Sequence, residues 1–190
     1  MANQTPPSTP KRVIIEGVGS FMNLFKPRAV KPGDKEFYSL AVLFAKGYDL
    51  GPLKALIRAC AEKKWGKDES QWPEGFRSPI KLQNPKKYEG HVEGCYFINA
   101  KTEQPPGIIA ADAVTRITDP SQIFSGCVVK VSVNPYVYSN TGNVGVALGL
   151  QNVQLIRHGK PLGGSRIAPE LEFSPVEDDE IKGKDASSLI

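Results

Sequence analysis

The feature of this sequence that most constrains its fold is an alternating pattern over 126–134, GCVVKVSVN, in which every second residue from Cys127 to Val133 is apolar. Successive side chains of an extended chain point to opposite faces, so the odd-numbered residues from Cys127 to Val133 are predicted to face a core. Residues 144–156, VGVALGLQNVQLI, predict a second strand whose internal glycines are typical of a strongly coiled barrel strand. The intervening PYVYSNTGN is predicted to be a hairpin loop with residues 140–143 at its tip.

Three further segments have the composition of strands. Residues 11–25, KRVIIEGVGSFMNLF, are rich in β-branched and aromatic residues and contain two glycines, which favours a strand that bends. Residues 36–46, EFYSLAVLFAK, and 95–101, CYFINAK, alternate in the manner of strands that are buried on one face. Prolines and glycines place residues 26–35, 67–94 and 105–107 in loops.

A helical pattern is found at residues 49–65, DLGPLKALIRACAEKKW. Asp49 is predicted to cap this helix, Pro52 suits its first turn, and Gly66 ends it. The apolar stripe consists of Leu53, Leu56, Ile57, Cys60 and Ala61. Five strands with one helix between the second and third predict a mainly β fold, a five-stranded barrel of the OB type with long loops.

A chain of 190 residues with 40% hydrophobic residues is sufficient for one domain with appendages. We expect a disordered N-terminus at 1–10, the barrel domain at 11–173 and a flexible acidic tail at 174–190. The sequence has no apolar run of the roughly 18 residues that a membrane helix needs, and its start does not resemble a signal peptide. Three widely spaced cysteines favour reduced thiols. These features predict a cytoplasmic protein without a membrane partner.

Charge is distributed unevenly along the chain. From Glu170 onward seven acidic residues stand against two lysines, which gives this end a net charge of −5. Since the whole chain carries +4, the preceding 169 residues carry +9. A basic body indicates a polyanionic partner. The alternative is a solvated basic surface that has no ligand.

Signatures of catalysis and of metal binding are missing from the sequence. The two histidines, His91 and His158, lie in no recognisable nucleophile, carboxylate or phosphate-loop motif, and GNVGVALG lies within a strand without a following helix. His91, Cys95 and Cys127 lack the paired spacing of a structural zinc site. We therefore predict a protein that is not an enzyme and that has no metal and no cofactor.

The segment CYFINAK sets Phe97, Asn99 and Lys101 on one strand face, and we assign Tyr96, with Phe44, to the core. Aromatic rings stack on bases and cations neutralise phosphates, a combination that holds single strands without reading their sequence. Rings and cations recur in this way on several predicted strands. The candidate DNA-binding residues are Phe21, Phe25, Lys26, Arg28, Phe37, Lys46, Phe97, Asn99, Lys101, Lys130, Tyr136 and Tyr138.

Several segments together resemble a known family. NLFKPRAV, KEFYSLAVLFAK, EKKWG, YFINAK, GCVVKVSVNPYVY and GNVGVALGLQNVQ occur in the order found in phage single-stranded DNA-binding proteins of the DUF2815 type, to which the Enc34 phage protein belongs. The resemblance covers residues 11–173. It implies an OB fold, sequence-independent binding of single-stranded DNA, and a role in phage DNA replication and recombination in the cytoplasm of the infected host cell.

The same resemblance extends to the single-stranded DNA-binding protein of T7-like phages, whose acidic C-terminal tail recruits replication proteins. It implies that Glu177, Asp178, Asp179 and Glu180 bind a partner here, although this tail carries two lysines and ends in SSLI rather than in an aromatic residue. A merely solubilising tail, a homodimer and weaker binding to duplex DNA are open alternatives. The alternative function is a β-barrel protein–protein or virion scaffold module that has no affinity for DNA.

Overall fold

The computed structural model describes residues 12–140 and 142–163, so the predicted disordered segment 1–10 and the acidic tail at 174–190 lie outside the described residues. Its long strands are β1 (Val13–Arg28), β2 (Phe37–Leu43), β5 (Tyr96–Thr102), β7 (Val128–Asn140) and β8 (Asn143–Arg157). Its other elements are helix α1 (Gly51–Trp65), short strands β3 (Phe76–Arg77), β4 (Ile80–Leu82) and β6 (Gly107–Ile109), and 3₁₀ turns Glu69–Gln71 and Pro120–Gln122.

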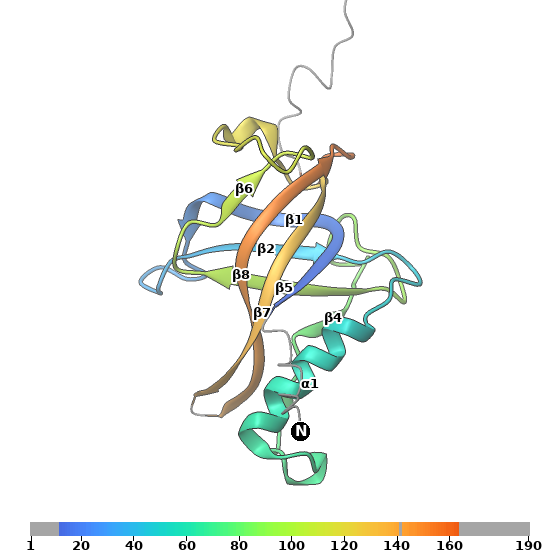
Figure 1. Cartoon of the computed structure of the whole chain (residues 1–190), viewed down its shortest axis with the longest axis vertical. Coiled ribbons are helices and arrows are strands. Elements are labelled where there is room, and N and C mark those ends of the chain that lie inside the picture. The colour runs from blue at the N-terminus through green and yellow to red at the C-terminus, as the bar shows by residue number, and fades with distance from the viewer. Residues whose placement is uncertain (1–11, 141, 164–190) are drawn as a thin grey trace, which may run out of the picture.

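The five long strands form a closed barrel in the order β8-β7-β1-β2-β5, and parallel pairing of β5 with β8 joins its two edges. Figure 1 shows β7 and β8 crossing the directions of β1, β2 and β5, as the strands of a small barrel do. The three short strands extend this sheet at its margins, β4 along β5 and both β3 and β6 along β8. The prediction of a five-stranded barrel is confirmed.

Strand alternation places the core inside the barrel. Val129, Val131 and Val133 of β7 are fully buried, as the sequence pattern predicts, and Leu148 of β8 packs with them. In β5 the inward residues Ile98 and Ala100 alternate with Phe97, Asn99 and Lys101 on the outer face. Phe44 belongs to the core as predicted.

Tyr96 is a correction, because its side chain is 40% exposed and not part of the core. Tyr96 points to the same strand face as Ile98, but it begins β5 and lines an open hollow with Lys46, Tyr48 and Gly94. Alternation gives the direction of a side chain, and at this end of β5 that direction leads out of the barrel.

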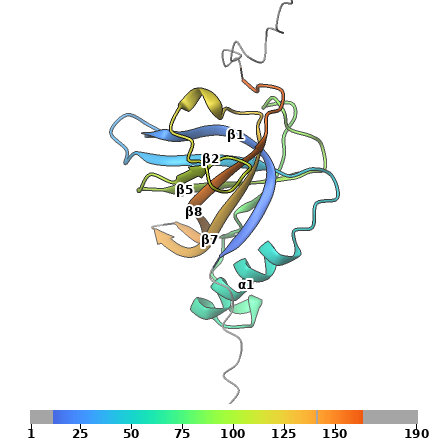
Figure 2. The same cartoon turned by 45° about the horizontal axis from the view of Figure 1, so that its top comes forward.

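Strand β1 serves two neighbours because it bends around the barrel (Figure 2). Its first half, Val13 to Val18, pairs with β7, and its second half, Val18 to Arg28, pairs with β2. The register slips between Ser20 and Asn23, where Phe21 has a φ of 48°. The strand also continues to Arg28, beyond the predicted end at residue 25, so that Lys26 and Arg28 belong to β1 and not to the following loop.

Strands β7 and β8 pair as far as Asn140 and Asn143, which confirms the position of the hairpin tip. The prediction of a loop over PYVY was wrong, because these residues lie within β7 and pair with β8. The hairpin therefore extends beyond the barrel. We call its paired residues 135–140 and 143–147 the arm. Gly145 allows the backbone of Arg77 in β3 to approach the arm, since a Cβ at this position would collide with it.

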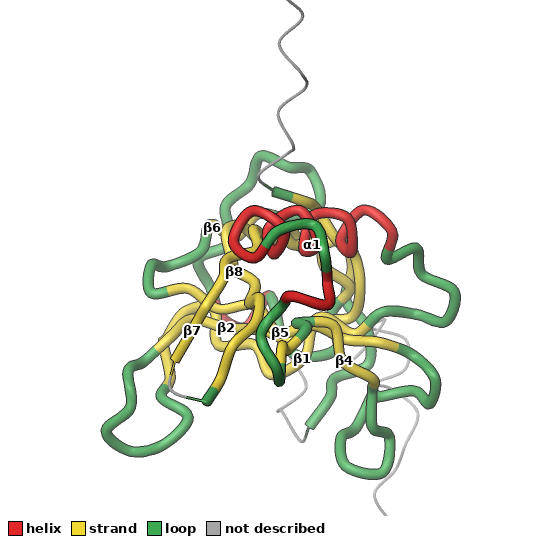
Figure 3. Tube along the Cα trace, turned by 90° about the horizontal axis from the view of Figure 1, so that it is seen from below, coloured by secondary structure: helices red, strands yellow, loops and turns green. Residues whose placement is uncertain are grey.

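Helix α1 lies between β2 and β5 in the chain, as predicted, and packs on β1, β7 and β8. Figure 3 shows it lying across one end of the barrel. It begins at Gly51 and not at Asp49, whose carboxylate accepts a hydrogen bond of 2.8 Å from the Gly51 amide. Leu53, Leu56, Ile57 and Ala61 are buried, whereas Cys60 is half-buried. In the part of the chain that the structure describes, no helix is long and apolar enough to cross a membrane.

Truncation of Ile98 to alanine is expected to lower the free energy of unfolding by about 2–5 kcal/mol, because it leaves a cavity in the barrel core. Tyr96→Ala, two residues away on the same strand, is the matched control and is expected to cost less than about 1 kcal/mol. Urea unfolding followed by circular dichroism measures both. Equal losses would contradict the placement of Tyr96 outside the core.

Candidate nucleic-acid interface

The outer face of β2 and β5 brings a ring, an amide and an ammonium group together. Antiparallel pairing sets Ser39 opposite Lys101 and Ala41 opposite Asn99. The Lys101 Nζ lies 4.4 Å from the centroid of the Phe37 ring, and Lys35 Nζ lies 6.0 Å from the same centroid. Such cation–π contacts keep the ammonium group over the ring and open to solvent. This face therefore presents positive charge directly beside an aromatic surface.

The arm continues this face on the other side of β5. Because Lys101 pairs with Gly149 and Gly149 pairs with Asn134, the three positions form one row across β5, β8 and β7. Two residues further along β7, Tyr136 is partly exposed. Burial raises the pKa of its phenol, with smaller contributions from the neighbouring Tyr138 and Glu103.

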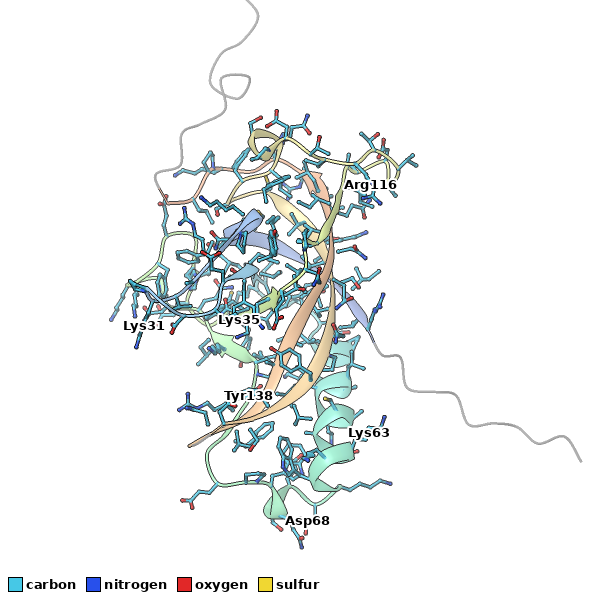
Figure 4. All side chains as sticks on the ribbon, turned by 90° about the vertical axis from the view of Figure 1, so that its left-hand side faces the viewer. Lys31, Lys35, Lys63, Asp68, Arg116 and Tyr138 are labelled. Carbon is cyan, nitrogen blue, oxygen red and sulfur yellow. The ribbon has the colours of Figure 1, made fainter. Side chains whose placement is uncertain are left out.

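Glu103, just after β5, forms an ion pair of 2.6 Å with Lys35 and also contributes to the raised pKa of Tyr136 on the arm. Figure 4 shows Tyr138 on the arm and Lys35 and Lys31 in the loop between β1 and β2. Phe37, Lys101 and the tyrosines of the arm therefore border one continuous surface.

The opposite end of the face is covered by residues 83–94, which we call the strap. Gln83 fixes its base: its side-chain amide donates to the carbonyl oxygens of Phe44 (2.9 Å) and Tyr96 (2.7 Å). The Gln83 Oε1 accepts from the Val92 amide at 2.7 Å, so one buried side chain ties both ends of the strap to the barrel.

Aromatic rings connect the strap with the barrel. His91 packs on Phe97 of β5 with 5.1 Å between ring centroids, and Tyr88 lies 5.2 Å from His91. Tyr88 in turn meets Phe21 of β1 edge to face at 5.6 Å. Ala41 and Leu43 alternate with the inward-facing Leu40 and Val42, yet they are also buried, as expected where the strap lies over the sheet.

The sequence analysis did not identify Tyr88, His91 or Lys87 as site residues, because it interpreted 67–94 only as a surface loop. The segment KKYEGH does carry the signal used elsewhere, a ring beside cations. The Lys87 Nζ lies 5.2 Å from the Tyr88 ring centroid. Only the tertiary structure shows that these residues return to the face formed by β2 and β5.

His91 is held as a neutral ring. Its side chain is 8% exposed, and Nδ1 accepts a hydrogen bond of 3.0 Å from the Asn84 amide. The proton of the neutral imidazole is consequently on Nε2, which has no hydrogen-bond partner among the described residues. Burial lowers the pKa of His91 because it disfavours the charged form.

The remaining predicted residues lie elsewhere, except Arg28, which pairs opposite Phe37 at the edge of this face. Phe25 packs against the core, and Lys26 and Arg28 line a hollow at the end of β1 with Lys31. Lys46 follows β2 at the end opposite Phe37 and lines the hollow that contains Tyr96.

Lys130 also lies apart, since it pairs with Glu16 of β1, with 3.8 Å between Nζ and Oε2. Within 12–140 and 142–163, no three His, Cys, Asp or Glu side chains are grouped so as to hold a metal ion.

Comparison with known proteins gives the family. The family model of the single-stranded DNA-binding protein of Enterobacter phage Enc34 matches residues 11–183. The chain belongs to this family. A curated relative, the putative protein p50 of Acyrthosiphon pisum secondary endosymbiont phage 1, is 28% identical over 173 residues, which cover 85% of this chain and 93% of the relative.

Solved structures agree with the fold of this Enc34-type protein. The Enc34 protein in complex with single-stranded DNA has a TM-score of 0.64 and 20% identity, over 80% of this chain and 90% of that one. The single-stranded DNA-binding protein gp2.5 of bacteriophage T7 has a TM-score of 0.56 and 15% identity, over 94% and 98%. The OB-type fold inferred from the sequence is confirmed, and the family is one of binding proteins, in agreement with the prediction of a non-enzymatic protein.

Acid is expected to destabilise this Enc34-type protein through His91. Its pKa in the folded chain lies below the ordinary value of 6.5, so the unfolded chain binds a proton more readily as the pH falls through 6.5. The free energy of unfolding therefore decreases as the pH falls from 6.5 to the lower pKa of His91 in the folded state. Above pH 6.5 His91 does not change it. Urea midpoints across this range measure the effect.

The variant His91→Phe retains a ring between Tyr88 and Phe97 but does not titrate. It is expected to lose this part of the acid sensitivity. The same pH dependence in wild type and variant would contradict the assignment to His91.

Proposed function

We propose that this protein binds single-stranded DNA independently of sequence and coats exposed strands during phage DNA replication and recombination. The observation that carries the proposal is the Lys101 ammonium group over the Phe37 ring, on an open face that also presents Asn99, whereas Phe97 is covered by His91 of the strap. A base stacked on a ring leaves its phosphate beside the cation, and every base has a face that can stack.

Charge and geometry agree with this mechanism. Residues 1–169 carry a net charge of +9, and Arg28, Lys35 and Lys101 concentrate part of that charge around Phe37. Lys35 is partly neutralised by Glu103, so Lys101 is the cation best placed for a phosphate. Neutralising phosphates releases counterions, and binding should weaken steeply with salt.

The comparisons support the ligand, because the family is described by single-stranded DNA binding and a similar structure contains single-stranded DNA. We place the activity in the cytoplasm of the infected host cell. Glu177, Asp178, Asp179 and Glu180, outside the described residues, would recruit replication proteins, as the resemblance to T7-like phages implies.

Phe37→Ala is expected to weaken binding to oligo-dT by about 1–3 kcal/mol, the contribution of one stacked base. Lys101→Ala is expected to reduce the salt slope of log K by about 0.7, because one phosphate contact is lost. Fluorescence anisotropy at several salt concentrations, with a matched duplex as competitor, measures both effects.

Lys63→Ala is the matched control, since Lys63 is an exposed cation of α1 outside this face. It is expected to change neither affinity nor slope. Wild-type protein without salt-dependent binding to oligo-dT would refute the proposal and favour a protein–protein module.

A further inference from the structure

Phe21 is held in a conformation that its own sequence does not favour. Its φ of 48° lies in the left-handed region, and besides Ala113 it is the only non-glycine residue there within the described part of the chain. An aromatic side chain adopts this region at a cost, and such strained residues concentrate at functional sites. The ring is 58% exposed, so burial in the core does not account for its position.

The register slip between Ser20 and Asn23 of β1 directs the Phe21 ring toward the strap. Its contact with Tyr88 is edge to face, with an interplanar angle of 85°, so the two rings meet without stacking their faces on one another. Phe21 comes from β1 and Tyr88 from the strap, and the row of contacting rings continues through His91 to Phe97 of β5. Since β2 lies between β1 and β5, this row of rings bridges the sheet at the end opposite Phe37.

Tyr88 is supported so that its ring is kept in place. The amides of Lys87 and Tyr88 both donate to the Asn84 carbonyl oxygen, at 3.2 and 3.1 Å, which makes a tight turn. His91 packs behind the Tyr88 ring and rests on Phe97. The Lys87 ammonium group lies over the Tyr88 ring, so a cation accompanies this ring as Lys101 accompanies Phe37.

We propose that a nucleobase of the bound single strand stacks on the exposed Phe21 ring, which Tyr88 holds edge to face, with Lys87 as the phosphate contact of that nucleotide; we call these three residues the aromatic clamp. This inference rests on the proposed function and extends it, because the strand would continue from the Phe37 and Lys101 end of the face to the strap. The strap is then a wall of the binding site and not only a connection between β4 and β5.

The strap has a second attachment, which provides a control. Glu89 Oε2 accepts a hydrogen bond of 2.9 Å from the Gly163 amide. Gly90, next to it, has a φ of 79° and leaves space for Leu162. Glu89→Gln loosens this attachment without removing a ring or a cation of the clamp.

The experiment compares oligo-dT of about 4 and of about 16 nucleotides, the limits of the usual site size of an OB fold. Tyr88→Ala is expected to weaken binding of the long oligonucleotide about tenfold and to leave the short one unchanged. Tyr88→Phe and Glu89→Gln are expected to bind both like wild type. Phe21→Gly is expected to weaken long-oligonucleotide binding about tenfold while its unfolding midpoint stays at the wild-type value, because glycine adopts a positive φ without strain.

A direct readout is photocrosslinking of the full chain to oligonucleotides containing 5-iodouracil, with the attached peptides mapped by mass spectrometry. Crosslinks to Tyr88 or Phe21 are expected. The clamp is refuted by crosslinks confined to β2, β5 and the arm, by Tyr88→Ala binding like wild type, or by Glu89→Gln weakening binding as much as Tyr88→Ala. If wild type binds neither oligonucleotide, the proposed function itself has failed.

Discussion

Parallel pairing of β5 with β8 is the contact on which the rest of this structure depends. It is short, joining Ala100 to Leu148 and Lys101 to Gly149, yet it turns a curved sheet into a barrel. Closure buries Ile98, Leu148 and Val133 around one core and removes two exposed strand edges. It also fixes the position of Lys101, because this residue takes part in the closing pair.

The proposed binding surface follows from that closure. β5 contributes Lys101 and Asn99, β2 contributes Phe37, and the arm contributes Tyr136. The arm reaches this surface because β7 and β8 continue past the barrel wall with paired backbones. A cation over a ring is a modest interaction in water, but it places an aromatic ring, on which a base can stack, beside a cation that can bind the phosphate.

The strap adds a second layer over the sheet. Gln83 and His91 are buried polar groups, and each directs its hydrogen bonds to backbone atoms that hold this segment in place. The Gln83 side chain, whose amide nitrogen and oxygen are both hydrogen-bonded, specifies one conformation where apolar packing alone would allow several. The rings of Tyr88 and His91 thereby gain fixed positions on a segment without a strand or helix of its own.

Local pattern was sufficient to predict much of the fold and part of the site. The period of two residues in a strand placed Ile98 and Ala100 inside and Phe97, Asn99 and Lys101 outside, because neighbouring side chains must face opposite ways. The same rule wrongly placed Tyr96 in the core, because alternation predicts the direction of a side chain but not whether that direction leads into the core. The residues of PYVY carry turn-forming signals, but pairing with β8 keeps them extended.

The sequence by itself therefore determined the five long strands, most of their faces, the single predicted helix and the character of the surface, but not the short strands β3, β4 and β6. Only the tertiary structure decided which faces meet. It separated Lys130 and Lys46 from Lys101, and it brought Tyr88 and His91 from a long loop onto Phe21 and Phe97. The physical reason is that local alternation acts over a few residues, whereas barrel closure and the bonds of Gln83 join segments far apart in the chain.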